Sequence, residues 1–247
     1  MNPDLENYTP APDLLKDRFI LVTGAGDGIG ATAARSFAQH GATVALVGRT
    51  QAKLEAVYDA IEAAGGPKPT IAVMDFSTTQ GDAYQNLVDA VEEQFGRLDG
   101  LLHNAGILGH RSPIEHYEIK TWLEVMHINL NAPFILTQTL LPLLHKSTDP
   151  SIVFTSSGVG RTSRAYWGAY AVSKFGTEGL MQTLASELNN MRINCINPGP
   201  IRTAMRKAAY PGEDPTTLLT PADIMATYLY LLGPDSEGIS GASLDCQ

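Results

Sequence analysis

The stretch "RFILVTGAGDGIGA", residues 18–31, joins an apolar run to a glycine-rich turn and predicts how this chain folds. The run at 18–23 lacks the alternation of a half-buried strand, which is typical of a strand covered on both faces of a parallel sheet. The glycines that follow favour a tight turn from this strand into a helix at 28–40. We therefore expect a strand, a turn and a helix as the first unit of an α/β fold.

The rest of the chain repeats this unit. Strand-like runs recur at "ATVALV" (42–47), "PTIAVM" (69–74), "DGLLH" (99–103), "SIVFTS" (151–156), "RINCIN" (192–197) and "GASLD" (241–245). Helix-like segments follow at 50–64, 80–95, 114–145, 167–190 and 221–232. Regular alternation of this kind predicts a doubly wound, seven-stranded parallel sheet with helices on both faces, a Rossmann fold.

No linker, repeat or low-complexity tract interrupts the alternation, so we expect a single domain over 1–247 with an N-terminal extension at 1–17. The segment 200–219 has no clear core pattern. It would follow the carboxyl end of a strand, where ligands bind in such sheets, and is interpreted as a substrate lid. Thr220, Pro221 and Asp223 then have the types and spacing of a helix start.

Composition argues against several classes of protein. There are 17 basic and 26 acidic residues, a net charge of -9, and no basic stripe for nucleic acid or an anionic membrane. The N-terminus lacks the pattern of a signal peptide and no apolar run reaches about 18 residues, so we expect a cytoplasmic protein. Cys195 and Cys246 have no metal-ligand spacing, and we expect neither a disulfide framework nor a metal site.

The glycine turn also favours nucleotide binding. Its backbone could approach a pyrophosphate closely, while the N-terminus of the next helix would stabilise the negative charge. A tight turn without a ligand has the same composition. The location of this turn at the first strand-to-helix junction favours the nucleotide.

The turn itself, Thr-Gly-x-x-x-Gly-Ile-Gly, resembles the fingerprint of the short-chain dehydrogenase/reductase family. Other motifs of that family follow in its order. They are Asp75 in "VMDFS", "HNAG" (103–106) with His103 in place of an Asn, Asn129, Ser157, the Tyr170/Lys174 pair and "NPGPIRT" (197–203). The resemblance covers about residues 18–245. Within the family, stretches such as "WGAYAVSKFGTEG" are similar to the YciK-like bacterial branch of oxidoreductases.

Tyr170 and Lys174 are four residues apart, so a helix presents both on one face. Alone, this pair is no more than an ordinary surface pair; the accompanying motifs favour catalysis. The resemblance implies that Tyr170 transfers a proton, Ser157 hydrogen-bonds the reacting oxygen, Lys174 holds the nicotinamide ribose, and Asn129 maintains a water relay. We also expect the ammonium to lower the pKa of the phenol by Coulomb attraction.

Arg49 ends the second strand where an NAD enzyme usually has an acid. A guanidinium there can bind a 2'-phosphate, which favours NADP(H) over NAD(H), although Asp27 in the turn would repel that phosphate. The predicted cofactor-binding residues are Gly24, Gly26, Asp27, Gly28, Ile29, Gly30, Arg49, Thr50, Asp75, Phe76, Asn104, Ala105, Gly106, Tyr170, Lys174, Pro198, Gly199, Ile201 and Thr203.

The leading hypothesis is an NADP(H)-dependent oxidoreductase that interconverts a carbonyl and an alcohol in a small molecule. Reduction of a 3-oxoacyl thioester is one alternative, and a non-catalytic NADP(H) sensor or scaffold is another. The resemblance implies a homodimer or homotetramer built on the helices at 114–145 and 167–190. His103 is interpreted as a packed histidine, and His110, Arg111, Arg161 and Arg164 are either solvated loop residues or attractors of an anionic substrate.

Overall fold

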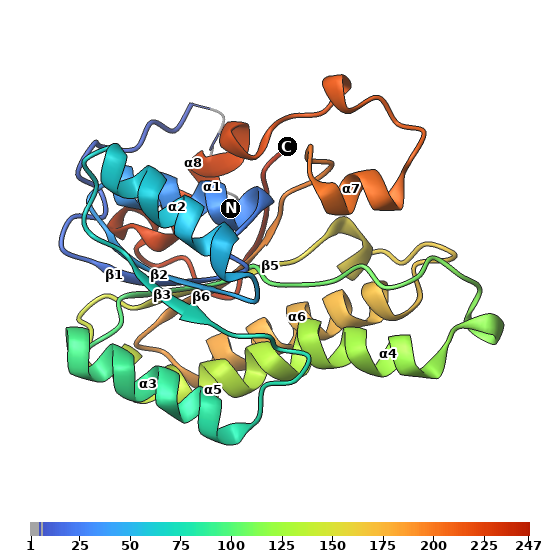
Figure 1. Ribbon diagram of the computed structural model, residues 1–247, viewed down its shortest axis with the longest axis horizontal. Helices are drawn as coiled ribbons and strands as arrows, with labels where there is room; N and C mark the ends of the chain where they lie inside the picture. The colour runs from blue at the N-terminus through green and yellow to red at the C-terminus, as the bar shows by residue number, and fades with distance from the viewer. Residues whose placement is uncertain (1–4, 6) are drawn as a thin grey trace.

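The computed structural model describes residue 5 and residues 7–247, and its strands form one parallel sheet (Figure 1). The order across the sheet is β3-β2-β1-β4-β5-β6-β7, and every neighbouring pair is parallel. The strands are β1 (Phe19–Thr23), β2 (Thr43–Gly48), β3 (Thr70–Val73), β4 (Gly100–His103), β5 (Ser151–Thr155), β6 (Arg192–Asn197) and β7 (Ser243–Asp245). The predicted seven-stranded parallel sheet is confirmed.

Helices cover both faces of the sheet (Figure 1). One face packs against α1 (Gly28–Gln39), α2 (Gln51–Ala63) and α8 (Met225–Leu232), and the other against α3 (Gly81–Phe95), α5 (Ala132–Leu144) and α6 (Gly168–Glu187). Each face has its own apolar core, because the side chains of a strand alternate between the two faces. No helix in the described part of the chain combines the length and the apolar character needed to cross a membrane.

The strand order reverses at β1. The chain passes from β1 to β2 and β3 on one side, then returns to place β4 against the other edge of β1. The loops that leave the carboxyl ends of β1 and β4 therefore diverge, and open α/β sheets bind ligands in the crevice formed at such a point. The glycine turn follows β1 and the loop starting at Asn104 follows β4.

The predicted helix at 114–145 is interrupted. It comprises a 3₁₀ turn (Ile114–His116), α4 (Ile119–Met126), a π-helical turn (His127–Asn131) and then α5. Asn129 lies within the π-helical turn, is buried, and hydrogen-bonds to the loop after β4.

Segment 200–219 is more ordered than its pattern indicates. Thr203 Oγ1 accepts a hydrogen bond from the Arg206 backbone N–H (3.2 Å) and starts α7 (Ala204–Ala209). This short helix buries only Ala209, so it has no apolar face that periodicity could detect. The expected start at Thr220 is confirmed, since the Asp223 carboxylate accepts hydrogen bonds from the Thr220 N–H and hydroxyl, each 2.6 Å long.

Candidate active site

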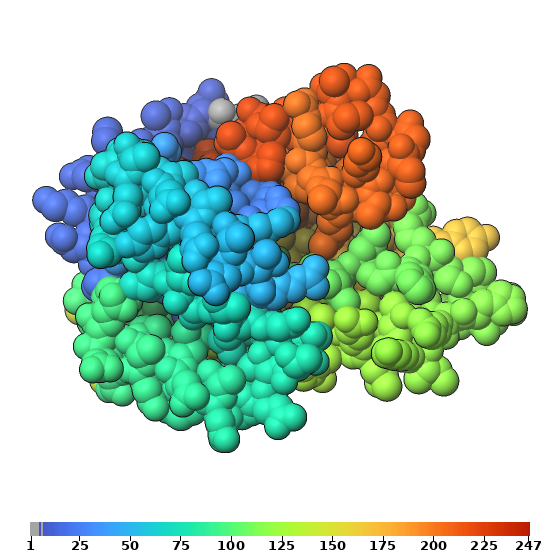
Figure 2. Space-filling view, viewed as in Figure 1, coloured from blue at the N-terminus to red at the C-terminus, as the bar shows by residue number. Residues whose placement is uncertain are grey.

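A cavity of about 590 Å³ opens at the carboxyl edge of the sheet. Figure 2 shows this face hollowed between the blue residues of the glycine turn and α2, the green residues around α4, and the orange segment that contains α7. Nearly all the predicted cofactor and catalytic residues line it, and the two exceptions are Gly30 and Asn129. Residues that lie far apart in the sequence therefore meet in one place.

The glycine turn is packed against the loop after β4. Gly24 has a φ of +67°, and a Cβ atom built on it would lie 3.0 Å from the Cα of Ala105. A Cβ on Gly30 would lie only 2.2 Å from the Gly24 carbonyl oxygen, so Gly30 shapes the turn from behind rather than lining the cavity. The Thr23 hydroxyl accepts hydrogen bonds from the backbone N–H groups of Asn104 (3.0 Å) and Ala105 (3.1 Å).

This turn provides what a pyrophosphate needs. The backbone is bare at the glycines, and the N-terminus of α1, with its partial positive charge, lies at the cavity wall. The Asp27 carboxylate caps α1 by accepting a hydrogen bond from the Gly28 N–H (2.7 Å). The residues present therefore fit a dinucleotide, with its phosphates at the turn.

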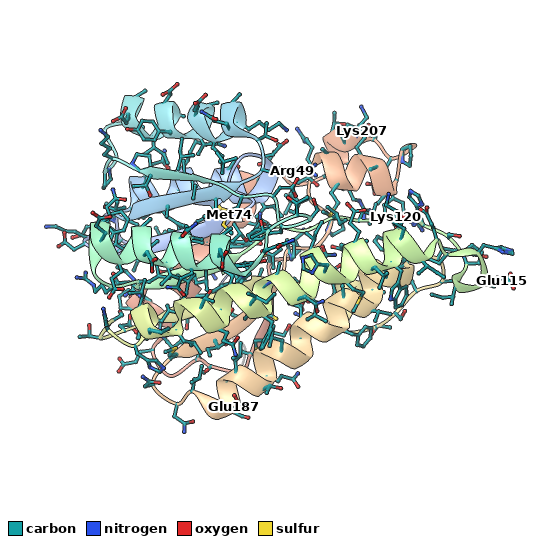
Figure 3. The ribbon with its side chains drawn as sticks, turned by 60° about the horizontal axis from the view of Figure 1, so that its bottom comes forward. Arg49, Met74, Glu115, Lys120, Glu187 and Lys207 are labelled. Carbon is teal, nitrogen blue, oxygen red and sulfur yellow. The ribbon has the colours of Figure 1, made fainter. Side chains whose placement is uncertain are left out.

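The predicted adenosine end contains one cation more than the sequence analysis identified. Arg49 is exposed after β2 (Figure 3), and among the described residues its side chain forms no ion pair. Lys53, one helical turn further along α2, also lines the cavity, and its Nζ lies 2.5 Å from an Asp27 carboxylate oxygen. The lysine thus offsets the negative charge of Asp27. Its four-residue spacing from Arg49 was the available signal.

Asp75 lies at the same end of the cavity. Its carboxylate accepts hydrogen bonds from the Ser77 N–H (2.9 Å) and hydroxyl (2.7 Å). These bonds hold the pKa of Asp75 below its usual value, and the nearby charge of Arg49 adds to the effect. The carboxylate is therefore held as an ionised acceptor at the cavity wall.

Three of the predicted catalytic residues meet at the other end. Tyr170 and Lys174 project from the first turns of α6 and are only 8% and 5% exposed as residues, and Ser157 follows β5. The Lys174 Nζ donates a 2.6 Å hydrogen bond to the Thr155 carbonyl and lies 5.7 Å from the centroid of the Tyr170 ring. Because a Cβ on Gly160 would lie 2.8 Å from the Cβ of Lys174, that glycine allows the loop after Ser157 to pack on α6.

The expected lowering of the phenol pKa by Lys174 was wrong for this structure. Burial raises the pKa of Tyr170 to about 12, and the adjacent Ser157 hydroxyl lowers it only in part. Burial also lowers the pKa of Lys174 to about 8. Desolvation disfavours the charged form of both groups and is the largest cause of each shift. Tyr170 is consequently a protonated phenol at neutral pH.

Asn129 lies behind the cavity wall. Its side-chain oxygen accepts a hydrogen bond from the Ile107 N–H (2.8 Å), while its amide donates to the Ile107 carbonyl (2.9 Å) and to the Ser173 hydroxyl (3.1 Å). It therefore ties the π-helical turn to the loop after β4 and to α6. Gly106 separates it from the reactive groups, since a Cβ there would lie 3.3 Å from Asn129 Oδ1 and 3.9 Å from Lys174 Nζ.

The remaining polar candidates do not line the cavity. His103 is buried, stacks on Phe154 and bonds to the Thr137 hydroxyl (2.8 Å), and burial lowers its pKa to about 3. Arg161 binds both oxygens of Asp245 at 2.9 Å, so it is neither a solvated loop residue nor an attractor of substrate.

His110 and Arg164 are exposed. Arg111 is exposed too, and its guanidinium lies over the rings of Trp167 and Tyr210. Within the described residues, no group of three or more His, Cys, Asp or Glu side chains could hold a metal ion.

The family model for short chain dehydrogenases matches residues 18–214. The uncharacterised oxidoreductase YciK of Escherichia coli K12 is 52% identical over 242 residues, covering 98% of this chain and 96% of the relative. A short chain dehydrogenase of Shigella flexneri in complex with NADP has a TM-score of 0.94 at 52% identity, over 96% of this chain and 100% of that chain. One from Escherichia coli CFT073 in complex with NADPH has a TM-score of 0.95 at 52% identity, with the same coverage.

Lys174 should make stability depend on pH. Its pKa falls from 10.5 to about 8 on folding, so the unfolded chain binds the proton more tightly between these values. The free energy of unfolding of the wild type should therefore increase by about 3 kcal/mol between about pH 8 and 10.5. Lys174→Met lacks the titrating group and should not show this increase. Urea unfolding of both proteins at pH 7 and 10 measures this. A stability difference that does not change with pH would contradict it.

Proposed function

The chain belongs to the short-chain dehydrogenase family, whose members are oxidoreductases, and we propose that it interconverts a carbonyl and an alcohol with NADP(H). One observation carries this proposal: Tyr170, Lys174 and Ser157 line the same cavity as the glycine turn. A cavity that joins a proton donor to a dinucleotide cradle suits hydride transfer coupled to proton transfer. We take residues 1–247 as one NAD(P)-binding domain, with 200–219 as its lid.

In the proposed reduction, the Tyr170 hydroxyl donates its proton to the substrate carbonyl oxygen. The Ser157 hydroxyl donates a hydrogen bond to the same oxygen as negative charge develops on it. NADPH, when bound, supplies the hydride. Because burial keeps the phenol protonated, the proton that reduction requires is already present at neutral pH. In the reverse reaction Tyr170 would have to lose its own proton first, and its phenolate would then take the proton from the alcohol.

Lys174 is proposed to hold the nicotinamide ribose through the ammonium that now donates to the Thr155 carbonyl. Asn129 is proposed to hold the loop after β4 against α6, and to support a water relay from Lys174 to solvent. Pro198, Gly199, Ile201 and Thr203 would contact the nicotinamide from the loop after β6, since all four line the cavity. These roles follow the family resemblance and suit the positions of the residues.

The proposed preference for NADP(H) rests on Arg49 and Lys53. Both cations line the adenosine end, and Lys53 offsets the charge of Asp27 beside it. A 2'-phosphate would add two negative charges that Arg49 can bind through paired hydrogen bonds. The NADP and NADPH complexes of the two similar structures support the same cofactor here.

Tyr170→Phe removes the transferable proton and leaves the ring. NADPH oxidation with an accepted aldehyde should fall by at least about 100-fold, because general acid catalysis contributes that much or more. Fluorescence titration should show nearly unchanged NADPH affinity. A variant that keeps its activity would refute the role, and a wild type that binds NADPH but reduces no carbonyl would favour the sensor or scaffold.

Arg49→Ala should weaken NADPH binding by about 10- to 100-fold and leave NADH binding nearly unchanged, since only NADPH carries the 2'-phosphate. Lys53→Met should also weaken NADPH binding more than NADH binding, because it leaves the charge of Asp27 unopposed beside that phosphate. Calorimetric titration with both nucleotides measures the ratio. Equal losses for NADH and NADPH would exclude a contact with the 2'-phosphate.

A homodimer or homotetramer is also proposed. Large apolar side chains are exposed on α4, α5 and α6, namely Ile119 (75%), Leu123 (61%), Phe134 (46%), Val172 (42%) and Phe175 (43%). Apolar patches of this kind commonly mark protein interfaces. Since these residues lie on the helices that the family resemblance implies, a second copy of the chain is the proposed partner.

The double variant Val172→Glu, Phe175→Glu should sediment as a smaller species than wild type, because each new carboxylate would be buried at the interface. Val73→Glu is the matched control, since Val73 is 53% exposed on the distant edge strand β3. Sedimentation velocity compares the three proteins. An unchanged species for the double variant would place the interface elsewhere.

A further inference from the structure

The part of the cavity beyond the nicotinamide loop is apolar. We call it the outer chamber and define it by Leu108, Trp167, Met205, Ala208 and Ala209, which come from the loop after β4, the residue before α6, and α7. Tyr170 packs with Trp167 and Ala209, and Ser157 lines the same cavity, so both polar groups border the chamber. A substrate in this chamber would exchange water for hydrocarbon and indole surface.

One charged side chain, Arg206 of α7, lines the cavity at the outer chamber. Its guanidinium is already occupied: Nε and Nη2 donate to the two carboxylate oxygens of Glu213, at 2.6 and 2.5 Å. It also lies 4.0 Å from the centroid of the Tyr210 ring. Both members of this ion pair are largely covered, with side chains 22% and 26% exposed.

A second guanidinium behind the chamber is occupied in another way. Arg111 lies 4.9 Å from the Trp167 ring centroid and 4.8 Å from that of Tyr210, and its Nη1 donates to the Ala209 carbonyl (2.6 Å). Cation–π contacts with two rings and a hydrogen bond to a carbonyl hold this guanidinium, and Arg111 does not line the cavity. This stack also joins α7 to the residue that precedes α6. The chamber wall is therefore built from fixed groups.

We propose that the substrate is an uncharged, apolar carbonyl compound with an aromatic or alicyclic ring that packs against Trp167, and that Glu213 disfavours carboxylates by occupying Arg206. This rests on the proposed function and assigns its substrate class. A carboxylate entering the chamber would lose hydration without gaining a free cation, which is a large penalty in an apolar site. A neutral aromatic or alicyclic ring would gain buried surface and contact with the indole.

Binding of unreactive probes tests this without turnover. In a Trp122→Phe background, Trp167 is the only tryptophan left and its fluorescence reports the chamber. With NADP bound, methyl benzoate should bind at least about tenfold more tightly than benzoate. Glu213→Gln should strengthen benzoate alone by about threefold, the value of a partly exposed ion pair. Equal or tighter benzoate binding in the Trp122→Phe protein, no binding of either probe, or no effect of Glu213→Gln would overturn the proposal.

Glu187→Gln is the matched control, because it makes the same change at the exposed far end of α6, away from Lys207 on α7 (Figure 3). It should leave the affinities of both probes unchanged. NADPH oxidation with 4-formylbenzoate and its methyl ester then tests the proposed function separately. If methyl benzoate binds as expected and neither aldehyde is reduced, the chamber assignment stands and the reaction assignment fails. Faster reduction of 4-formylbenzoate than of its ester would overturn the substrate class.

Discussion

The close approach of the glycine turn to the loop after β4 is the constraint on which the rest of the site depends. A side chain at Gly30 would overlap the Gly24 carbonyl oxygen, and one at Gly24 would crowd the Ala105 backbone. The Thr23 hydroxyl joins the two segments by accepting hydrogen bonds from two N–H groups. This contact brings the N-terminus of α1 to the cavity. It also sets the position of Gly106, which separates Asn129 from Lys174. The phosphate cradle and the proton-transfer groups are consequently positioned by one interaction.

The two ends of the cavity differ in how far their ionisable groups are exposed to water. Arg49, Lys53, Asp27 and Asp75 are wholly or partly exposed, so water screens their interactions. The two cations can therefore leave their present surroundings and bind a phosphate. Tyr170 and Lys174 are almost completely buried, and desolvation raises the pKa of the phenol and lowers that of the amine. Both shifts favour the neutral form of the group. The first environment suits recognition of an anion. The second suits a proton held in place until a substrate arrives.

Much of this arrangement could be predicted from the sequence, because unbroken apolar runs mark strands buried on both faces. The motif residues that line the cavity could be predicted as well, but Lys53, Trp167 and Arg206 belong to no motif and were missed. Three kinds of feature were not predictable. Helix α7 has no apolar face, the ion pair of Lys53 with Asp27 spans 26 residues, and the stack on Arg111 joins three distant segments. The predicted direction of the pKa shift of Tyr170 was wrong, because the spacing of residues shows which charges are near a group and does not show how much water surrounds it.

The reversal of strand order also bears on how the chain folds. Residues 81 positions apart, Thr23 and Asn104, must meet before the crevice between β1 and β4 exists. Closing so long a loop is entropically costly and is rewarded only when the β1–β4 pairing is complete. A chain that has formed only β1, β2 and β3 would possess the glycine turn but lack the surface that holds it in shape. Cofactor binding can therefore stabilise only folding intermediates in which β1 and β4 are already paired, because earlier intermediates lack the binding crevice.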